Sequence, residues 1–280
     1  MAVSLGKAVG SEADRGSDMG DAYKSKRRAP SADTPIARRG FVLKVPRPVA
    51  RFTPYPVPVS PIMGVFRTLI DRDDPVLLEI GCNDGQDTSR FLKTFPRCRM
   101  HCFEPDERPL ERFSRHVSSD DRRVRLHRVA VGDRDGPVTF HLSSGMPPCV
   151  REWARDLDLK EWDLSSSIHP PTGHLDRSPW CTFERTIVVP MIRLDTFLTA
   201  NPDITSIDLI WADVQGAEAD LILGATETLR RTRFLYTEFY DKPMYEGQPN
   251  KEQLQAMLPG WKLLGIYGQN LLLRNDELLT

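Results

Sequence analysis

An alternation of short apolar segments with helical patterns constrains this chain of 280 residues more than any other feature. The first apolar segment, Val76 to Ile80, has the length of a strand and is ended by Gly81. A helical pattern over Gln86 to Phe95 follows and stops at Pro96. The chain then continues as strand, helix and strand, over Arg99–Phe103, Asp106–Val117 and Val124–Val131. This β-α-β-α-β order predicts a parallel sheet with helices on both faces.

The same alternation resumes in the second half of the chain. Ile207 to Ala212 is an apolar strand, followed by a helical stripe formed by Ala217, Leu221, Ala225 and Leu229. The remaining expected elements are a strand, a helix and two strands, over Phe234–Phe239, Asn250–Leu258 (capped by Asn250), Trp261–Tyr267 and Asn270–Arg274. Gly268-Gln269 joins the last two strands as a hairpin. We therefore expect an α/β, Rossmann-like sheet that is mostly parallel and has an antiparallel last strand.

Three segments fall outside this alternation. Residues 1–44 are poor in large apolar side chains, so we expect a disordered basic tail. Residues 45–61 contain six prolines and predict an extended arm, and 62–280 is expected to form the catalytic domain. Within that domain, 143–180 is irregular, and such a long loop is typical of a lid, a substrate-binding segment or disorder. Further strands are expected on either side of it, over Val138–Leu142 and Thr186–Val189.

Composition favours a cytoplasmic enzyme. The net charge is -1, and no apolar run approaches the roughly 18 to 20 residues that cross a bilayer. The first residues lack the apolar centre of a secretory signal. Five cysteines are odd in number and have no metal-ligand spacing, so we expect reduced thiols and no metal site. They are Cys82, Cys98, Cys102, Cys149 and Cys181.

Positive charge is concentrated near the N-terminus. The first 60 residues carry 11 Lys and Arg against 5 Asp and Glu. A basic tail can hold an acidic surface or a nucleic acid, or it can simply be solvated. The chain has no Asn-Pro-Pro-aromatic or Asp-Pro-Pro-aromatic tetrapeptide, and its folded part has no basic patch interleaved with aromatic residues. We therefore predict no nucleic-acid partner.

The candidate ligand-binding residues begin in the segment from Glu79 to Gly85, where the first strand gives way to its helix. Ligands of open α/β sheets bind at the carboxyl ends of the strands, beside helix N-termini. Gly81 and Gly85 permit backbone conformations closed to other residues. Glu79 would attract a cationic ligand and repel a phosphate, and Asn83 stands where the dinucleotide fingerprint G-x-G-x-x-G needs its second glycine. The segment favours a sulfonium-bearing nucleoside over a dinucleotide.

Glu104 ends the second strand, 19 residues beyond Gly85. Nucleoside-binding α/β sheets carry an acid at about this distance because a carboxylate accepts hydrogen bonds from both ribose hydroxyls. The alternative is a surface glutamate at the start of a helix. We expect Glu104 to bind the ribose.

Two further acids end later strands. Asp213 follows Ile207 to Ala212, and Glu238 ends the next strand, so both carboxylates are expected at the same edge of the sheet. They can position a hydroxyl, act as a general base or hold a divalent metal, and either can instead be a helix cap or an ion-pair partner. Asp213 is the first candidate for the base, followed by Glu238, His169 and His174. The histidines titrate near neutrality in a segment that could fold over the site, or they belong to a plain loop surface.

Six stretches of sequence, taken together, resemble the FkbM family of class I methyltransferases. In chain order they are LLEIGCNDGQDTSRFL, MHCFEPDERPLERF, HRVAVGDRDGPVTFHL, the serines 165 to 167, VPMIRLDTFL and IDLIWADVQGAEADLILGATETL. They cover about residues 70 to 240. The resemblance implies a seven-stranded methyltransferase sheet, S-adenosylmethionine as methyl donor and, usually, O-methylation of a hydroxyl.

The resemblance also implies a cofactor site. Its residues would be Glu79, Gly81, Cys82, Asn83, Gly85, Glu104, Pro105, Ala130, Val131 and Asp213. The first loop would surround the methionine moiety and Glu104 would bind the ribose. Ala130 and Val131 would lie beside the adenine, and Asp213 near the transferring methyl group.

Two positions depart from the family pattern. The family commonly reads Lys-Ile-Asp-Val-Glu-Gly where this chain has Trp211-Ala-Asp-Val-Gln-Gly216. Trp211 and Gln215 therefore change the usual charge pattern around Asp213.

These observations predict an S-adenosylmethionine-dependent O-methyltransferase. Its expected acceptor is a hydroxyl of a small molecule, a sugar or glycan, or a natural product, and a homo-oligomer stays open beside a monomer. Two alternatives remain at this point: an NAD(P)-dependent oxidoreductase on a similar sheet, and a non-catalytic nucleoside-binding module of methyltransferase fold.

Overall fold

A computed structural model describes residues 59–148 and 160–279 of the chain, all of them within the unit Lys44–Thr280. The expected tail, residues 1–44, and the expected arm up to residue 58 lie outside the described residues, as does Cys149. The first helix, α1 (Val59–Leu69), begins three residues before Ile62 and includes Pro61 in its first turn. A proline is tolerated there because the first helical N–H groups have no partner within the helix.

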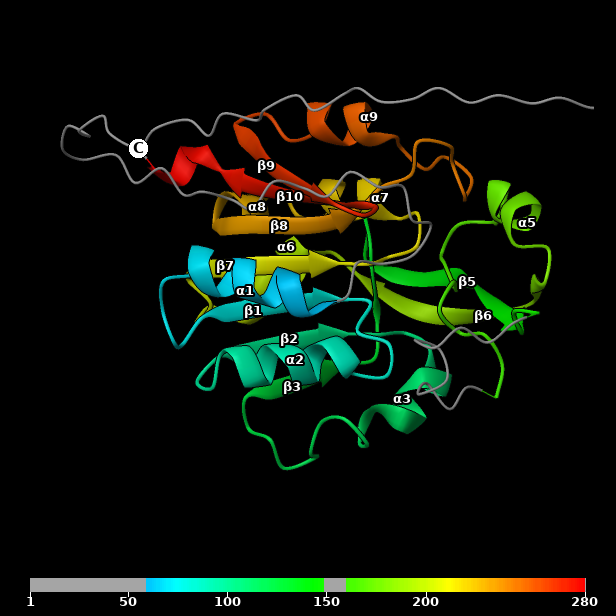
Figure 1. Ribbon diagram of the computed structural model, residues 1–280, viewed down its shortest axis with the longest axis horizontal. Coiled ribbons are helices and arrows are strands. Elements are labelled where there is room, and N and C mark those ends of the chain that lie inside the picture. Colours follow the sequence, from blue (N-terminus) through cyan, green and yellow to red (C-terminus); the bar gives the residue numbers. More distant parts are fainter. Residues whose placement is uncertain (1–58, 149–159, 280) are drawn as a thin grey trace, which may run out of the picture. The chain divides into compact units, whose positions relative to one another are not determined.

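Seven strands form the main sheet, in the order β3-β2-β1-β7-β8-β10-β9 (Figure 1). They are β1 (Val76–Ile80), β2 (Arg99–Phe103), β3 (Val124–His127), β7 (Ile207–Ala212), β8 (Thr232–Glu238), β9 (Trp261–Tyr267) and β10 (Asn270–Asn275). The pairs from β3 to β8 are parallel, and β10 is antiparallel to both of its neighbours. The predicted Rossmann-like sheet with an antiparallel last strand is confirmed.

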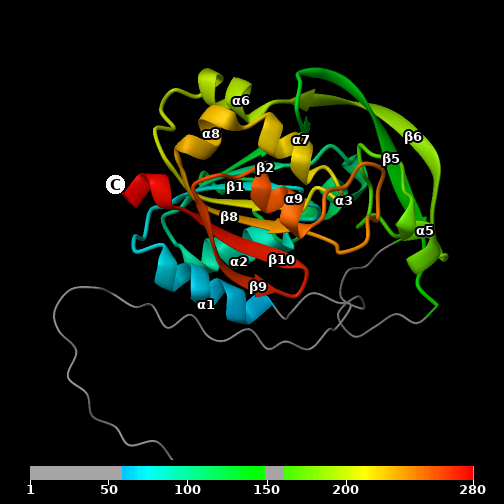
Figure 2. The same cartoon turned by 90° about the horizontal axis from the view of Figure 1, so that it is seen from above.

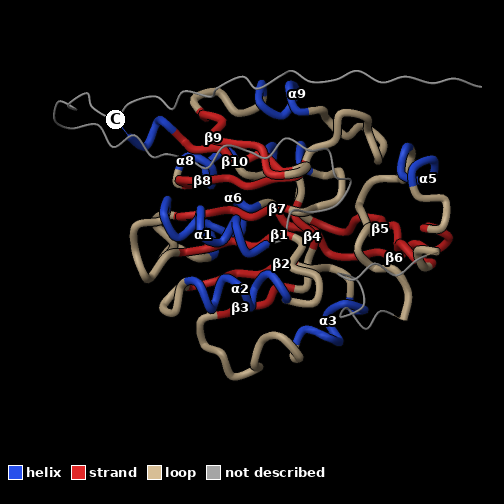
Figure 3. The backbone as a smooth tube through the Cα atoms, in the orientation of Figure 1, coloured by secondary structure: helices blue, strands red, loops and turns tan. Residues whose placement is uncertain are grey.

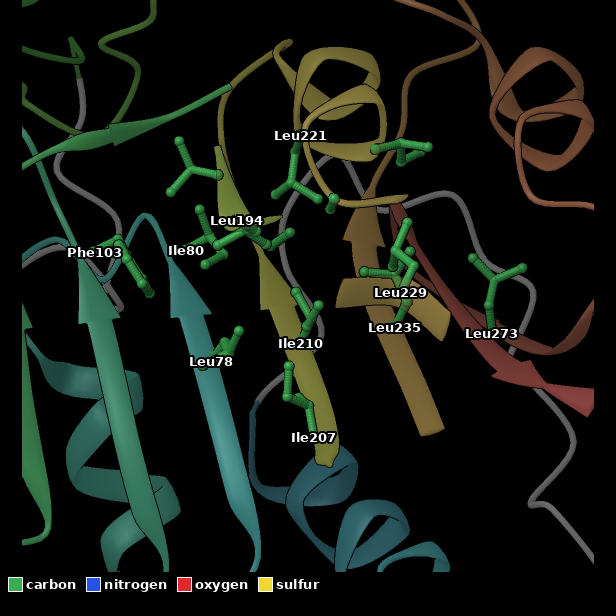
Figure 4. Packing of buried hydrophobic residues seen from close by; sticks show 14 of the residues in the cluster. Leu78, Ile80, Phe103, Leu194, Ile207, Ile210, Leu221, Leu229, Leu235 and Leu273 are labelled. Atoms are coloured by element: carbon green, nitrogen blue, oxygen red, sulfur yellow. The ribbon is translucent and has the colours of Figure 1, made fainter. Parts of the chain in front are cut away.

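Helices cover both faces of this sheet, as predicted (Figure 2). Along β1, Leu77 packs into one hydrophobic cluster, and Leu78 and Ile80 pack into the other, because successive side chains of a strand point to opposite faces. The first cluster includes residues of α1, α2 (Gln86–Thr94) and α3 (Glu107–Phe113). The second, drawn in Figure 4, includes residues of α6 (Leu194–Ala200), α7 (Glu218–Leu223), α8 (Thr226–Arg230) and α9 (Lys251–Ala256).

The predicted cap of α9 is confirmed. The Asn250 side chain accepts a hydrogen bond from the Gln253 backbone N–H, and the Gln253 side chain accepts one from the Asn250 N–H in return. The expected single helical stripe from Ala217 to Leu229 is two helices instead, α7 and α8. The chain turns between them at Gly224, where a Cβ would overlap the carbonyl oxygen of Gly132.

The expected strand Val124–Val131 is wrong as one element. Its first half is β3 of the main sheet, and its second half is β4 (Ala130–Val131), which joins a second, three-stranded sheet in the order β4-β6-β5 (Figure 3). The chain leaves one sheet for the other because Ala130 and Val131 pair with β6 (Cys181–Ile192) some 60 residues later. The third strand of that sheet is β5 (Gly136–Gly145), antiparallel to β6.

Part of the irregular segment 143–180 has secondary structure. It includes the end of β5, the short helix α5 (Gly173–Arg177) and an isolated bridge between His141 and Ser167. The four described cysteines are buried free thiols, as expected. Within the described part of the chain, no helix is long and apolar enough to cross a membrane.

Candidate active site

The loops that follow β1 and β7 meet at the carboxyl edge of the main sheet. Gly81 has φ +82°, and a Cβ at this position would overlap the carbonyl oxygen of Asp213. The Asp213 N–H in turn donates to the Ile80 carbonyl at 2.9 Å. Any side chain at position 81 would force the two loops apart. Glycine therefore places Asp213 directly beside the candidate cofactor loop.

Glu104 closes this loop from the neighbouring strand. Its two carboxylate oxygens accept hydrogen bonds from the backbone N–H groups of Asn83, at 3.0 Å, and Asp106, at 2.9 Å. Asn83 takes up the left-handed conformation, with φ +47°, which asparagine tolerates better than most residues. Burial raises the pKa of Glu104 to about 8. The carboxylate is thus fixed and desolvated, and each oxygen retains a lone pair for a further donor.

Glu79 and Cys82 lie inside the fold. The Glu79 carboxylate accepts a hydrogen bond from the Thr88 hydroxyl of α2 at 2.5 Å and one from the Cys102 thiol at 3.5 Å. Burial raises the pKa of Glu79 well above its usual range. Cys82 belongs to the hydrophobic cluster beneath α1 and α2. The expected contact of Glu79 with a cationic ligand stays a prediction, and in this structure its carboxylate ties β1 to the first turn of α2.

Asp213 and Glu238 come together at the ends of β7 and β8, as predicted, through a third residue. The Gln215 side-chain amide donates to Asp213 Oδ1 at 2.6 Å and to Glu238 Oε2 at 3.2 Å. The Tyr240 hydroxyl donates to the other oxygen of Glu238 at 2.9 Å. Although Asp213 is accessible to solvent, the protein around it raises its pKa to about 6. Burial, and then the charge of Asp213, raise the pKa of Glu238 well above its usual range.

The two candidate histidines have different surroundings. His169 Nε2 lies 2.7 Å from Asp220 Oδ2 of α7, and this hydrogen bond raises the pKa of His169. His174 is buried against the rings of Phe183 and Tyr245, and burial lowers its pKa to about 4. The partners of the two rings are Asp220 for His169 and aromatic rings for His174, and a role for either histidine as the base stays a prediction.

The remaining predicted cofactor residues lie on the same side of the fold. Pro105 follows Glu104 and is half-buried. Ala130 and Val131 are buried in β4, where Val131 belongs to the main core and Ala130 to the core of the second sheet. A contact of either residue with adenine remains a prediction.

The irregular segment packs onto both groups of residues. The Asp163 carbonyl accepts a hydrogen bond from the Asn83 side chain at 3.4 Å. The Ser165 carbonyl accepts one from the Tyr245 hydroxyl at 2.8 Å. The same hydroxyl lies 3.0 Å from the Gln215 side-chain oxygen and shares its single proton between the two acceptors, so this segment links the cofactor loop to the Asp213 site.

Two arginines of α3 hold the segment in place, and neither was expected from the sequence. Arg112 pairs with the buried Asp163 at 2.8 Å. Arg108 pairs with Asp106 at 2.6 Å and with Glu161 at 2.8 Å. The sequence shows arginines at helical spacing, which is equally typical of a solvated helix face. Only the fold reveals Glu161 and Asp163 as their partners, because these two lie more than 50 residues away in the chain.

The donors and acceptors of this edge fit the predicted S-adenosylmethionine. Glu104 offers a fixed carboxyl group to a diol, and the ionised Asp213 favours a cationic ligand over a phosphate. Among the described residues, no group of three His, Cys, Asp or Glu side chains is arranged to hold a metal ion.

A family model and a similar protein of known activity point to the same family. Residues 79–263 match the model of the methyltransferase FkbM domain. The 2-O-methyltransferase NoeI of Sinorhizobium fredii (strain NBRC 101917 / NGR234) is 44% identical over 216 residues, which are 75% of this chain and 84% of NoeI. Methyltransferase 1 of Beauveria bassiana (strain ARSEF 2860) is 24% identical over 153 residues, 54% of this chain and 59% of that protein.

Solved structures match more remotely. The SAM-bound CalS10, an amino pentose methyltransferase from Micromonospora echinaspora, is 12% identical, with a TM-score of 0.40 over 78% of this chain and 89% of CalS10.

Proposed function

This chain belongs to the FkbM methyltransferase family, and from that premise we propose that it methylates a ring hydroxyl of a sugar or glycosylated natural product. As a member of the family it is an S-adenosylmethionine-dependent methyltransferase. This membership decides against the NAD(P)-dependent oxidoreductase and the non-catalytic module considered above. The acceptor class is supported by NoeI, a 2-O-methyltransferase whose length this chain covers almost completely.

The observation that carries the proposal is the packing of the Asp213 backbone on Gly81, which puts Asp213 directly beside the cofactor loop. When bound, S-adenosylmethionine supplies the methyl group: the acceptor oxygen forms a bond to the methyl carbon while the carbon–sulfur bond breaks, and the electron pair stays on sulfur. A neutral hydroxyl is a poor nucleophile, so a base must take its proton. Asp213 is the base in this proposal, and it accepts the hydroxyl proton at a carboxylate oxygen.

Cofactor binding is assigned to the loop from Gly81 to Gly85 and to Glu104. The fixed Glu104 carboxylate accepts hydrogen bonds from the two ribose hydroxyls. The loop brings its backbone against the methionine moiety, with Ala130, Val131 and Pro105 beside the nucleoside. Holding donor and acceptor in line lowers the barrier by removing the entropy cost of their encounter.

The electrostatics favour Asp213 over His169 as the base. Since the pKa of Asp213 is about 6, the carboxylate is ionised at pH 7 to 8 and still basic enough to accept a proton. The Asp220 carboxylate raises the pKa of His169, so more of this imidazole is protonated at neutral pH. A protonated histidine cannot act as a base. His169 therefore has a structural role in this proposal, as the hydrogen-bond partner of Asp220 in α7.

The localisation, the excluded substrate class and the domain organisation are proposed from the composition of the chain. We place the enzyme in the cytoplasm, where its buried thiols stay reduced, and exclude nucleic acid as a substrate. The proposed organisation is a basic tail over 1–44, an extended arm over 45–58 and a methyltransferase domain that begins with α1 at Val59, three residues earlier than the sequence predicts. Monomer and homo-oligomer both fit this organisation.

The test is transfer of labelled methyl from S-adenosylmethionine to a panel of glycosides. Each acceptor is offered with its 2-hydroxyl free, and again with that hydroxyl replaced by hydrogen. We expect label only on acceptors with the free hydroxyl, together with stoichiometric S-adenosylhomocysteine. Transfer to a protein, a nucleic acid or an amine, with none to any sugar hydroxyl, would reject the acceptor class.

A further inference from the structure

We propose that Gln215 is the positioning residue of this site: its side-chain amide separates the carboxylates of Asp213 and Glu238 and holds Asp213 as the proton acceptor. The inference rests on the proposed function, because it assigns a role toward the base of that same reaction. Gln215 is also one of the two positions at which the chain departs from the family pattern.

Three hydrogen bonds determine how the Gln215 amide lies. Its NH₂ group donates to Asp213 at 2.6 Å and to Glu238 at 3.2 Å, and its carbonyl oxygen accepts from Tyr245 at 3.0 Å. The reverse orientation would bring the amide oxygen within 2.6 Å of a carboxylate oxygen, which is repulsive. The two carboxylates therefore allow a single orientation, in which every amide hydrogen points at an acid. The amide oxygen shares the single Tyr245 hydroxyl proton with the Ser165 carbonyl.

The backbone around Gln215 supports the same geometry. Gln215 has φ +50°, in the left-handed region that few non-glycine residues adopt, and such residues concentrate at functional sites. Gly216 follows with φ +96°, and a Cβ there would lie 2.7 Å from the ring of Tyr245. The ring thus packs directly on the turn, and its hydroxyl reaches both Gln215 and the Ser165 carbonyl. The Ser165 carbonyl of the irregular segment therefore holds the turn at Gln215 and Gly216 in place through Tyr245.

A neutral donor at this position has a specific electrostatic effect. The charge of Asp213 disfavours ionisation of Glu238. The Gln215 hydrogen bond lowers the pKa of Asp213, against the larger effect of desolvation by the surrounding protein. Glu238 receives the longer of the two Gln215 hydrogen bonds, 3.2 Å against 2.6 Å, and burial together with the charge of Asp213 raises its pKa. The proton of the pair therefore resides on Glu238, and Asp213 is left free to accept one from the substrate.

Among the described residues, no cation acts on Asp213 in place of Gln215. The charged side chains that act on the two acids from outside the pair are Asp87 of α2, Glu218 of α7 and Arg177 of α5, and the neighbouring tyrosines Tyr236, Tyr240 and Tyr245 are neutral. Only Arg177 is positive, and it acts on Glu238. Trp211, which replaces the family's lysine, packs its ring against Phe91 and Tyr236. With that lysine absent, the amide of Gln215 is the donor that stabilises the Asp213 carboxylate.

The experiment measures kcat/KM for the glycoside acceptor, at saturating S-adenosylmethionine, between pH 5 and 9. It compares the full-length wild type with Gln215→Glu and Gln215→Met. In the wild type kcat/KM should rise with pH through about 6, as Asp213 loses its proton. Gln215→Glu keeps the shape of the side chain but adds a carboxylate, so the acidic limb should move up by about one pH unit. That shift is about a fivefold loss at pH 6, approaching tenfold at pH 5, and is recovered near pH 9. Gln215→Met removes both donors and should lower kcat at every pH with KM for S-adenosylmethionine unchanged.

Controls separate this role from a structural one. Gln255→Glu adds the same charge at a half-buried position of α9, outside the hydrogen bonds of the pair, and should leave the profile unchanged. Each variant is checked by thermal unfolding and by calorimetric binding of S-adenosylmethionine. If Gln215→Glu does not fold, Gln215→Met carries the test through its kcat. An unshifted limb in folded Gln215→Glu, or an unchanged kcat in Gln215→Met, would overturn the inference.

A second readout keeps the inference distinct from the proposed function. Carboxylate carbon NMR of aspartate-labelled protein reports the titration of Asp213 without any acceptor, using Asp213→Asn to assign the signal. We expect the Asp213 titration midpoint to be higher in Gln215→Glu than in the wild type. If no glycoside is methylated but this shift is observed, the acceptor class fails and the role of Gln215 stands. The same midpoint in both proteins, with methylation intact, would reject the role alone.

Discussion

The active site has two halves that are held in different ways. The cofactor half, the loop from Gly81 to Gly85 with Glu104, is fixed by hydrogen bonds to backbone N–H groups within a single β-α-β unit. The acceptor half, Asp213, Gln215 and Glu238, is fixed by side chains that bond to one another and to Tyr245. Backbone-held geometry follows from the local chain, whereas side-chain geometry depends on distant segments. Substitutions elsewhere on the protein should therefore affect the cofactor half little. Substitutions in distant segments can change the acceptor half, and with it the specificity.

The segment around Asp163 and Ser165 is the physical link between the halves. One carbonyl accepts a hydrogen bond from Asn83 and the other from Tyr245. Substitutions in each half and in the link should consequently give three different signatures, in catalysis, in binding and in stability.

The largest effect is expected in the acceptor half, at Asp213→Asn. Loss of a general base lowers kcat by about 10² to 10⁴. The affinity for S-adenosylmethionine should stay within about threefold, because the Asp213 backbone contacts to the cofactor loop remain. Steady-state kinetics and calorimetry measure the two quantities. Asp203→Asn, at an exposed acid bonded to Arg99, is the control and should behave as the wild type. A kcat within tenfold of the wild type would remove Asp213 from the role of base.

The next effect concerns the link, at Asp163→Asn. This change leaves the buried Arg112 guanidinium without its ion-pair partner, which costs about 3 kcal/mol of unfolding free energy. For a domain of this size the melting temperature should fall by about 6 to 10 °C. The matched control is Glu227→Gln, which breaks an exposed pair with Arg230 and should cost less than about 0.5 kcal/mol. Equal melting temperatures for the two variants would show that the Arg112 pair does not anchor the segment.

A smaller effect is expected in the cofactor half, at Glu104→Ala. Losing two hydrogen bonds to a carboxylate should weaken S-adenosylmethionine binding by about 10- to 100-fold, measured by calorimetry. The sign of the pH dependence follows from the pKa of Glu104, about 8: ribose hydroxyls donate to the ionised form, so binding should tighten as the pH rises from 7 to 9. In Glu104→Ala this dependence should vanish. Unchanged affinity would reject the ribose assignment.

The sequence predicted the fold best where a strand-length run has clear boundaries. β1, β2, β7 and β9 match the expected residues, because each is a strand-length run bounded by polar or turn residues. β4 was missed as a separate strand because its two residues pair with a strand far along the chain. The break between α7 and α8 was missed for a related reason: the contact of Gly224 with Gly132 exists only in the folded chain.

The candidate site residues also differ in how far the sequence could predict their contacts. Glu104 could be placed from its distance to Gly85, since both lie in one β-α-β unit. Gln215 could be noticed as a departure from the family pattern, but its bonds to Glu238 and Tyr245 span 23 and 30 residues and leave no local signal. Glu79 was expected to face a ligand, and its bond to Thr88 became visible only with α2 in place.

The smallest effect is expected at Asp220→Asn, which tests whether His169 belongs to the chemistry of the acceptor half. Asp220 raises the pKa of His169 above its unfolded value, so this pair stabilises the fold fully below pH 6.5 and loses that contribution as pH rises through the folded pKa. Asp220→Asn should therefore unfold more easily than the wild type at pH 6, by about 1 kcal/mol or less for a partly exposed pair, and equally at pH 9. Urea unfolding at both pH values measures the difference. The kcat of this variant should stay within about threefold at every pH. A kcat whose acidic limb moved with Asp220→Asn and not with Gln215→Glu would assign the base to His169 and make the second half of the site a histidine–aspartate pair.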